Sequence, residues 1–166
     1  MTPAEILERL KEVAPYSEVV LEEIQPDPVL LVPVESLFTI AEKLKDTDNL
    51  AFDFLKCLSG VDKGETLQVV YHIYSMRNRH HLAMRVVVPK DNPAVPTVSK
   101  IWPAADWHER EAYDLVGIIF NNHPDPRRIL CPDDWEGHPL RKDYKPPEEF
   151  HGIPLTSILP AQASRE

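Results

Sequence analysis

Four side chains that are able to bind a metal ion lie in the last third of the chain: His123, Cys131, His138 and His151. A closed zinc site uses about four Cys, His or carboxylate ligands, which usually come in pairs separated by about two to five residues. The intervals between these four residues are 8, 7 and 13 positions, and they match no paired pattern. We therefore predict no metal site. A stand-alone metalloenzyme built on these side chains is kept as an alternative that metal analysis of the purified protein tests.

The rest of the sequence offers little for catalysis or for nucleotide binding. Its five glycines form neither G-x-G-x-x-G nor G-x-x-x-x-G-K-[ST], the patterns of phosphate-binding loops. No serine lies in the G-x-S-x-G pattern of a nucleophile. The two cysteines, Cys57 and Cys131, are too few to ligate an iron–sulfur cluster alone, and a reducing compartment would keep them as thiols. We predict no catalytic residue and no cofactor on this chain.

The charge of the sequence excludes some classes of partner. It has 27 acidic and 18 basic residues and a formal charge of -9, which repels nucleic acid and anionic lipid at long range. No apolar run approaches the roughly 20 residues of a membrane-spanning helix. Residues 1–5 have neither the basic start of a secretory signal nor the arginine-rich character of a transit peptide. We expect a chain that binds no nucleic acid, does not span a membrane and stays in the compartment where it is made.

Helices are predicted on both sides of the first strands. Thr2, Pro3 and Glu5 fit the N-cap, the first-turn proline and the carboxylate of a capping box, and apolar residues at helical spacing follow. We predict a first helix over residues 3–14. The same spacing returns over residues 34–45 and predicts a second helix there.

Extended segments make up the middle of the chain. Runs rich in β-branched residues predict short strands over 17–24 and 29–32. Three longer extended segments, 50–61, 66–75 and 80–89, are separated by short polar turns. Consecutive strands with short connections pair as an antiparallel meander. We predict this meander as the most regular part of the fold.

The last predicted helix ends the regular part of the chain. Residues 91–96 are predicted as a loop and 104–116 as a helix, closed by Gly117 at the position after its end. The fold class that follows is α+β, an antiparallel or mixed sheet flanked by helices. We predict one domain over residues 1–120.

Residues 121–166 form a segment of different composition. Eight of the 17 prolines lie there among large apolar side chains, which forbids long helices and central strands but is too apolar for a solvated linker. Ordering about 40 residues costs on the order of 40 to 80 kcal/mol of backbone entropy, which a small domain cannot offset alone. We predict an extended, proline-rich tail that completes its folding on another protein.

Three pieces of sequence occur in a fixed order: E-R-E-x-Y-D-L-x-G-I at 109–118, H-P-x-x-R-R-I-L at 123–130 and D-W-x-G-x-P-L-R-K-D-Y at 134–144. Together with V-V-Y-H-I-Y-S at 69–75 and V-P-x-V at 95–98 they resemble the signature of the 30 kDa-type subunit (named C) of respiratory NADH:quinone oxidoreductase, complex I. Two positions depart from the family pattern. Pro126 stands where leucine is usual, and Val116 stands where an aromatic residue is common.

The resemblance implies a non-catalytic subunit of the hydrophilic, peripheral arm of a proton-translocating complex. Such a subunit lies beside the quinone-site subunit (named D) and the iron–sulfur subunits, on the cytoplasmic side of the bacterial plasma membrane. It has no cofactor of its own, because FMN, the iron–sulfur clusters and quinone bind to partner subunits. Two alternatives stay open: a homologous subunit of a membrane-bound hydrogenase or of a quinone oxidoreductase with another donor, and an adaptor domain with no redox role.

Tyrosine, tryptophan and arginine dominate many protein interfaces, and here they alternate with charged residues inside the signature. We assign structural or interface roles to the following residues: Glu109, Arg110, Glu111, Tyr113, Asp114, His123, Arg127, Arg128, Asp134, Trp135, Arg141, Lys142, Asp143 and Tyr144.

Two of these residues carry specific expectations. Glu109 lies on the apolar face of the predicted helix, so we expect it to be partly buried. We expect a salt bridge or hydrogen bonds to an arginine such as Arg127 or Arg128, or to Arg85. The alternative is a proton-relay acid. Arg110 lies on the opposite face, where it is either part of a solvated network of ion pairs or a contact to a partner.

Overall fold

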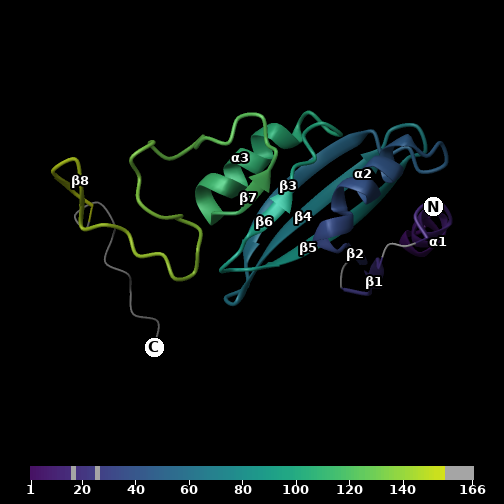
Figure 1. Ribbon diagram of the computed structural model, residues 1–166, viewed down its shortest axis with the longest axis horizontal. Helices are drawn as coiled ribbons and strands as arrows, with labels where there is room; N and C mark the ends of the chain where they lie inside the picture. The colour runs from purple at the N-terminus through teal and green to yellow at the C-terminus, as the bar shows by residue number, and fades with distance from the viewer. Residues whose placement is uncertain (16–17, 25–26, 156–166) are drawn as a thin grey trace.

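A five-stranded mixed sheet is the centre of the fold in the computed structural model, which describes residues 1–15, 18–24 and 27–155 (Figure 1). The strands lie in the order β1-β2-β5-β4-β3. Their bounds are β1 Val20–Glu22, β2 Val29–Leu31, β3 Phe54–Asp62, β4 Thr66–Ser75 and β5 His80–Pro89.

The predicted meander is confirmed, because β3, β4 and β5 pair in sequence and antiparallel. Strand β2 adds to β5 in parallel and β1 adds to β2 antiparallel, so the sheet is mixed. The first strand is shorter than the predicted 17–24, part of which lies outside the described residues. Strand β3 begins at Phe54 and not at residue 50, because Ala51 adopts a left-handed φ of 45° that ends any extended run.

The first helix begins with the predicted capping box. Helix α1 spans Pro3–Val13. The Glu5 amide donates to the Thr2 hydroxyl over 3.3 Å, and the Thr2 amide donates to the Glu5 carboxylate over 2.8 Å. Two of the amides that a helix start leaves without partners are satisfied in this way.

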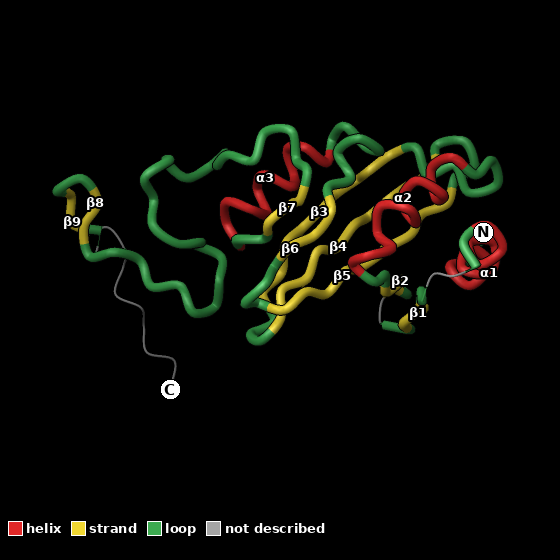
Figure 2. The backbone as a smooth tube through the Cα atoms, in the orientation of Figure 1, coloured by secondary structure: helices red, strands yellow, loops and turns green. Residues whose placement is uncertain are grey.

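Two further helices pack with the inner face of the sheet. A short 3-10 turn, η1 (Val34–Ser36), leads into α2, which spans Leu37–Asp46, and α3 spans Ala105–Val116 (Figure 2). Their buried side chains join those of β3, β4 and β5 in a single hydrophobic cluster. The α+β fold class is therefore confirmed.

Helix α3 lies close to strand β3 because Gly60 has no side chain. A Cβ atom added at Gly60 would lie 3.1 Å from Ile118 Cδ1, 3.2 Å from Val116 Cγ2 and 3.3 Å from Ala112 Cβ. A side chain at this position would require these neighbours to shift. Gly60 thus sets the height at which the signature residues of α3 lie above the strands.

The prediction of a loop over residues 91–96 is wrong in part. Ala94–Pro96 forms strand β6, which pairs in parallel with β7, Ile119–Asn121. The partner strand follows 25 positions later, beyond helix α3, and a local pattern does not reveal such pairing. The short ladder fixes the segment before α3 to the segment after it.

Beyond β7 the chain leaves the sheet and runs as irregular structure past the end of α3 (Figure 1). The last described elements form a small hairpin of β8, Glu149–Phe150, and β9, Ile153–Pro154. Residues 156–166 of the predicted tail lie outside the described residues. In the part of the chain that the structure describes, no helix has the length and apolar character that crossing a membrane requires.

Candidate functional site

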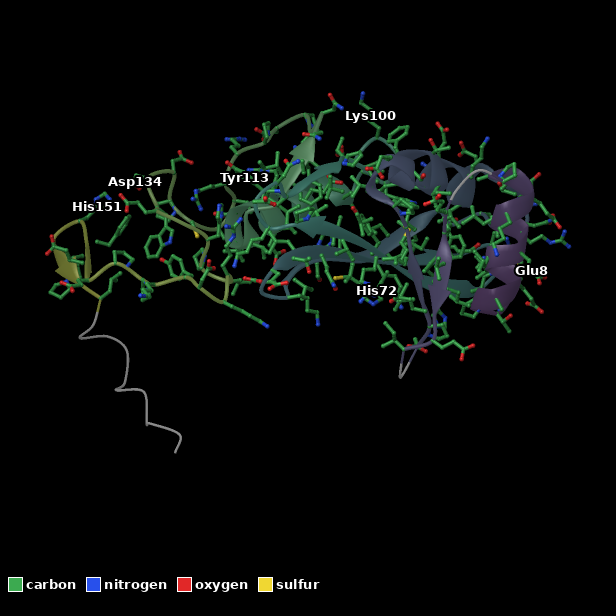
Figure 3. All side chains as sticks on the ribbon, turned by 60° about the horizontal axis from the view of Figure 1, so that its bottom comes forward. Glu8, His72, Lys100, Tyr113, Asp134 and His151 are labelled. Atoms are coloured by element: carbon green, nitrogen blue, oxygen red, sulfur yellow. The ribbon has the colours of Figure 1, made fainter. Side chains whose placement is uncertain are left out.

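The signature residues that follow β7 fold around the C-terminal end of helix α3. We name residues 123–144 the clasp. In Figure 3, Tyr113 of α3 lies toward the end of the molecule where Asp134 of the clasp is found. The clasp is attached at four places: the Asp114 side chain, the last carbonyls of α3, the turn between β3 and β4, and the Arg110 guanidinium.

The Asp114 carboxylate is the main attachment of the clasp. It is fully buried and accepts hydrogen bonds from the amides of Ile129, Leu130 and Cys131 over 3.0, 2.7 and 2.8 Å. Arg128 Nη1 donates to Asp114 Oδ1 over 2.7 Å. Burial by itself raises the pKa of Asp114, but the amides of Cys131 and Leu130, the Arg128 guanidinium and the Ile129 amide lower it to about 2. The carboxylate is therefore ionised at neutral pH.

Arg128 joins this carboxylate to the far side of the clasp. Its Nη2 donates to the carbonyls of Trp135 and Gly137 over 2.9 and 3.0 Å, while Nη1 also reaches the Asp114 carbonyl at 3.3 Å. The planar guanidinium presents its donors in a fixed fork. One side chain thus closes residues 128–137 into a loop.

The last carbonyls of α3 are capped by the clasp. His138 Nδ1 donates to the Asp114 carbonyl over 2.9 Å, Arg141 Nε to Val116 over 2.8 Å and the Leu140 amide to Leu115 over 2.9 Å. A helix leaves its last four carbonyls without intrahelical partners and carries partial negative charge there. The clasp supplies both the donors and the positive charge.

Gly117 allows this close approach. It is the αL residue that ends α3, with φ of 76°, as predicted. A Cβ atom there would lie 2.5 Å from the His138 ring and 2.7 Å from the Arg141 guanidinium.

The third attachment is at Asp62, the last residue of β3. Its buried carboxylate accepts from the Lys142 amide over 2.9 Å and from the Gly64 amide over 2.7 Å. Lys90 Nζ lies 3.3 Å from Asp62 and 3.0 Å from Asp143. Burial raises the pKa of Asp62, but the Lys142 and Gly64 amides and Lys90 bring it below its usual value.

The prediction that Glu109 pairs with an arginine is wrong. Glu109 is fully buried, but its oxygens accept from the Thr97 hydroxyl over 2.5 Å and the Val98 amide over 2.8 Å. Arg128 pairs with Asp114 instead, and Arg85 pairs with Glu22. Among the described residues, no lysine or arginine forms an ion pair with Glu109.

The interpretation of Arg110 as part of a solvated network is also wrong, whereas its contact to a partner stays a prediction. Arg110 is 8% exposed because the clasp folds over its face of the helix. Its guanidinium donates to the carbonyls of Arg127 and Arg128 over 3.2 and 3.1 Å, with Asp125 at 3.6 Å. Arg110 therefore holds the start of the clasp within the same chain.

The other predicted residues divide into exposed and half-buried groups. Glu111, Arg127, Asp134, Lys142 and Asp143 are exposed. Tyr113, Trp135, Arg141 and Tyr144 are half-buried.

A second small cluster lies further along the chain. The Trp135 and Phe150 rings pack with centroids 4.9 Å apart, and His151 Nε2 lies 2.7 Å from Asp134 Oδ2. His123, His138 and His151 thus contact different partners. In the described part of the chain, no three His, Cys, Asp or Glu side chains gather in a way that could hold a metal ion, and Cys57 and Cys131 are free thiols.

Three contributors were missed from the sequence: Asp62, Thr97 and Asp125. Asp62 lies in no motif, whereas Thr97 and Asp125 occupy variable positions of the pieces at 95–98 and 123–130. The available signal was therefore position alone, because Asp62 precedes a predicted turn and the other two lie inside the signature.

A known protein family matches the part of the chain that contains helix α3 and the clasp. The model of the family described as "Respiratory-chain NADH dehydrogenase, 30 Kd subunit" matches residues 30–150. The chain belongs to this family. The match includes all of α3 and the whole clasp.

Alignments with individual members of the 30 Kd subunit family cover most of the chain. The NADH-quinone oxidoreductase C subunit of Chloroherpeton thalassium is 52% identical over 122 residues, which cover 72% of this chain and 51% of that protein. The same subunit of Roseiflexus sp. strain RS-1 is 43% identical over 143 residues, 84% of this chain and 82% of that one. The chain therefore spans about half the length of the first relative and most of the second.

Two solved structures share the family fold. The trypsin-resistant fragment of Nqo5 superposes with a TM-score of 0.60 and 28% identity, covering 75% of this chain and 99% of that fragment. A chain of the membrane-bound sulfane sulfur reductase, an archaeal respiratory membrane complex, superposes with a TM-score of 0.70 and 26% identity, covering 86% and 85%.

Proposed function

We propose that this chain is a non-catalytic subunit of the peripheral arm of a proton-translocating NADH:quinone oxidoreductase, on the cytoplasmic side of the bacterial plasma membrane. In this proposal the chain contacts the quinone-site subunit and adjacent iron–sulfur subunits. Electrons pass from NADH through FMN and iron–sulfur clusters to quinone on those partners. The family membership and the names of the relatives support the proposal.

The observation that carries the proposal is the contrast between the two sides of the clasp. Leu130 and Leu140 are 63% and 61% exposed, although the amide of each is bonded inward, to Asp114 and to the Leu115 carbonyl. Large apolar side chains on a fixed backbone are suited to binding, because little conformational entropy is left to lose. We propose that these two side chains contribute to an interaction surface.

The chemistry of the clasp suits positioning more than reaction. The half-buried Arg128 of the clasp and the buried Asp114 and Arg110 of α3 are each engaged with other groups of the chain. We propose that the chain keeps the quinone-site subunit in register with its electron donor, since a misplacement of about 1 Å is costly for reacting groups.

The test is a double substitution, Leu130→Asp with Leu140→Asp, in the full chain within its host complex. The thermal midpoint of the isolated chain is expected to stay unchanged, because both side chains are exposed. The amount of the quinone-site subunit that copurifies, and with it NADH:quinone activity, is expected to fall several-fold.

Met76→Asp is the matched control, since Met76 is also 63% exposed but lies in the β4–β5 turn. Wild-type recovery of the quinone-site subunit with the double variant would overturn the proposal.

A second candidate function is the same positioning role in a respiratory complex with another electron donor. The likeness to a chain of the sulfane sulfur reductase complex favours it. Purified complex that reduces quinone with NADH excludes this candidate, whereas complex that is inert with NADH but accepts electrons from hydrogen or a sulfur donor supports it.

A further inference from the structure

Strand β3 forms one edge of the central sheet, and the proposed function makes no use of this edge. It is the last strand in the order β1-β2-β5-β4-β3, and in the described part of the chain no strand pairs with it on its outer side. Figure 2 shows β3 at the margin of the sheet, beside helix α3. A sheet edge presents N–H and C=O groups that are able to pair with a further strand.

The register of the hairpin decides which residues present these groups. The Lys63 amide donates to the Thr66 carbonyl over 2.9 Å, and bonded and non-bonded pairs alternate along an antiparallel ladder. Counted back from this bond along the register, Ser59 directs its amide and carbonyl to β4. The amides and carbonyls of Leu58 and Gly60 are therefore directed away from β4, to the outer side of the sheet.

The stretch of β3 over residues 57–61 lacks the features that protect a sheet edge. Many proteins protect such edges with charged residues or proline, but the sequence C-L-S-G-V contains neither. A bulge interrupts the pairing next to Lys56 at one end, and the clasp binds Asp62 through the Lys142 amide at the other. The free stretch between them has about the length of an ordinary strand, which is about five to six residues.

A groove lies next to this stretch, between β3 and α3. Its volume is about 150 Å³, and most of its lining is apolar: Leu58 and Gly60 come from β3, Ala112 and Leu115 from α3, and Leu140 from the clasp. An apolar cavity of about 150 Å³ is large enough to bind benzene. The groove therefore has room for one aliphatic or aromatic side chain.

The edge and the groove fit the same occupant. Neighbouring residues in adjacent strands direct their side chains to the same face of a sheet. Gly60 faces α3, since a Cβ atom added there would lie 3.3 Å from Ala112 Cβ. A residue that pairs with Gly60 from the outer side thus directs its side chain to the face where α3 and the groove lie.

We infer that an extended segment of the quinone-site subunit pairs with β3 at Leu58 and Gly60 and places one apolar side chain in the groove. Main-chain hydrogen bonds give such an interaction its affinity, and the side-chain pocket gives specificity. Leu140 connects this edge to the proposed interaction surface, because its exposed side chain also lines the groove. The inference rests on the proposed function for the identity of the partner, and on the register for the pairing.

The first experiment compares amide exchange, resolved to single residues, in the isolated full chain and in the purified complex. In the isolated chain, the Leu58 and Gly60 amides are expected to exchange at least about tenfold faster than the Ser59 amide, which is bonded to β4. In the complex their exchange is expected to slow by at least about tenfold, while Ser59 stays slow. Amides of Leu58 and Gly60 that exchange equally fast in both samples, or slowly in the isolated chain, overturn the inference.

The same experiment separates this inference from the proposed function. A complex that contains the quinone-site subunit and leaves Leu58 and Gly60 unprotected contradicts the pairing alone. A complex from which the quinone-site subunit is absent contradicts both.

The second experiment identifies the occupant. A photo-reactive amino acid is placed at Ser59, which is exposed, in the full chain within its complex. It is expected to cross-link to one peptide of the quinone-site subunit that contains an aliphatic or aromatic residue, and alternate amides of that peptide are expected to be protected. A cross-link to another subunit, to a second copy of this chain or to residues 156–166 overturns the inference.

His81 is the control position for the cross-link. It is exposed on β5, and β4 separates it from the edge. The same photo-reactive amino acid at His81 is expected not to reach the peptide that Ser59 reaches. A cross-link from both positions to this peptide would show an occupant that lies across the face of the sheet, which contradicts pairing at the edge.

Discussion

The carboxylate of Asp114 and the guanidinium of Arg128 lie 2.7 Å apart at the end of helix α3. Asp114 also accepts from three successive amides, while Arg128 also donates to two carbonyls across the loop. The pair thus joins a helix to the irregular segment that follows it. The stability of that segment is expected to depend on this pair more than on any hydrophobic contact of its own.

Replacing Asp114 with Asn is expected to destabilise the chain by about 3 kcal/mol, because the amide group adds a donor among donors and leaves Arg128 unpaired. Urea unfolding at neutral pH measures the loss. Asp133→Asn is the control, since Asp133 is an exposed clasp residue, and its effect is expected to stay within about 0.5 kcal/mol. Equal unfolding midpoints for Asp114→Asn and wild type would refute the role given to the pair.

Because of the same carboxylate, we expect the free energy of unfolding to decrease at acidic pH. The pKa of Asp114 is about 2 in the folded chain, against an ordinary value of 3.8. Because it is depressed, its contribution is present above about pH 4 and is lost as the pH falls through 2. The loss amounts to about 2 kcal/mol. Unfolding free energies measured at several pH values between about 2 and 5 should show this decrease in wild type and a smaller one in Asp114→Asn.

For Glu109 we expect the opposite dependence, in which the free energy of unfolding decreases as the pH rises. Its pKa is raised from 4.5 to about 7, so the folded chain binds the proton more tightly than the unfolded chain. Its contribution is complete below about pH 4.5 and is lost as the pH rises through 7, by about 3 kcal/mol in total. Glu109→Gln should lack this slope and be more stable than wild type at about pH 8. A slope that persists unchanged in the variant would assign it to other groups.

Gly117→Ala tests the contact between the clasp and the helix end. Alanine there meets the His138 ring at 2.5 Å and also has to adopt φ of 76°. Gly64→Ala is a matched control, because its φ is 96° but nothing lies within 4 Å of the added Cβ. The control is expected to cost about 1 kcal/mol from backbone strain and Gly117→Ala about 2 kcal/mol more, as measured by thermal unfolding. Equal destabilisation by the two substitutions would show that the clasp moves away from the added methyl group without loss of stability.

Asp62→Asn tests the third attachment. The variant weakens the bond to the Lys142 amide and loses the ion pair with Lys90. Amide exchange at Lys142 is expected to speed up about tenfold while exchange at Ile129 is unchanged. Asp143→Asn, whose side chain is 65% exposed, should leave Lys142 protected. Faster exchange at both amides in Asp62→Asn would mean that the attachments are not independent.

Local signals explain why much of the fold was predictable from the sequence. The capping box of Thr2 and Glu5, the meander of β3 to β5 and the αL residue Gly117 each depend on neighbours a few positions away. The signature also located the segment that forms the clasp, because its three pieces come from residues that meet in space. The burial of Glu109 followed from its position on the helix.

The failures share a physical cause. The partners of Glu109 come from Thr97 and Val98, whose approach depends on the β6–β7 pairing. Arg110 is buried by a segment of irregular structure. A backbone group can form a hydrogen bond to a distant side chain whatever the type of its own residue. The sequence therefore does not reveal such a partner. Electrostatic pairing of opposite charges was therefore a poor guide to the partners of both residues.

Asp114 binds residues 129–131 through their backbone amides and not through their side chains. Substitutions at these three positions keep the amide donors unless they introduce proline, which has no amide hydrogen. The surface that they present is thus free to diverge while its scaffold stays the same. Under the proposed function, a chain of this kind acquires a different partner by substitution at Leu130, with no new fold required.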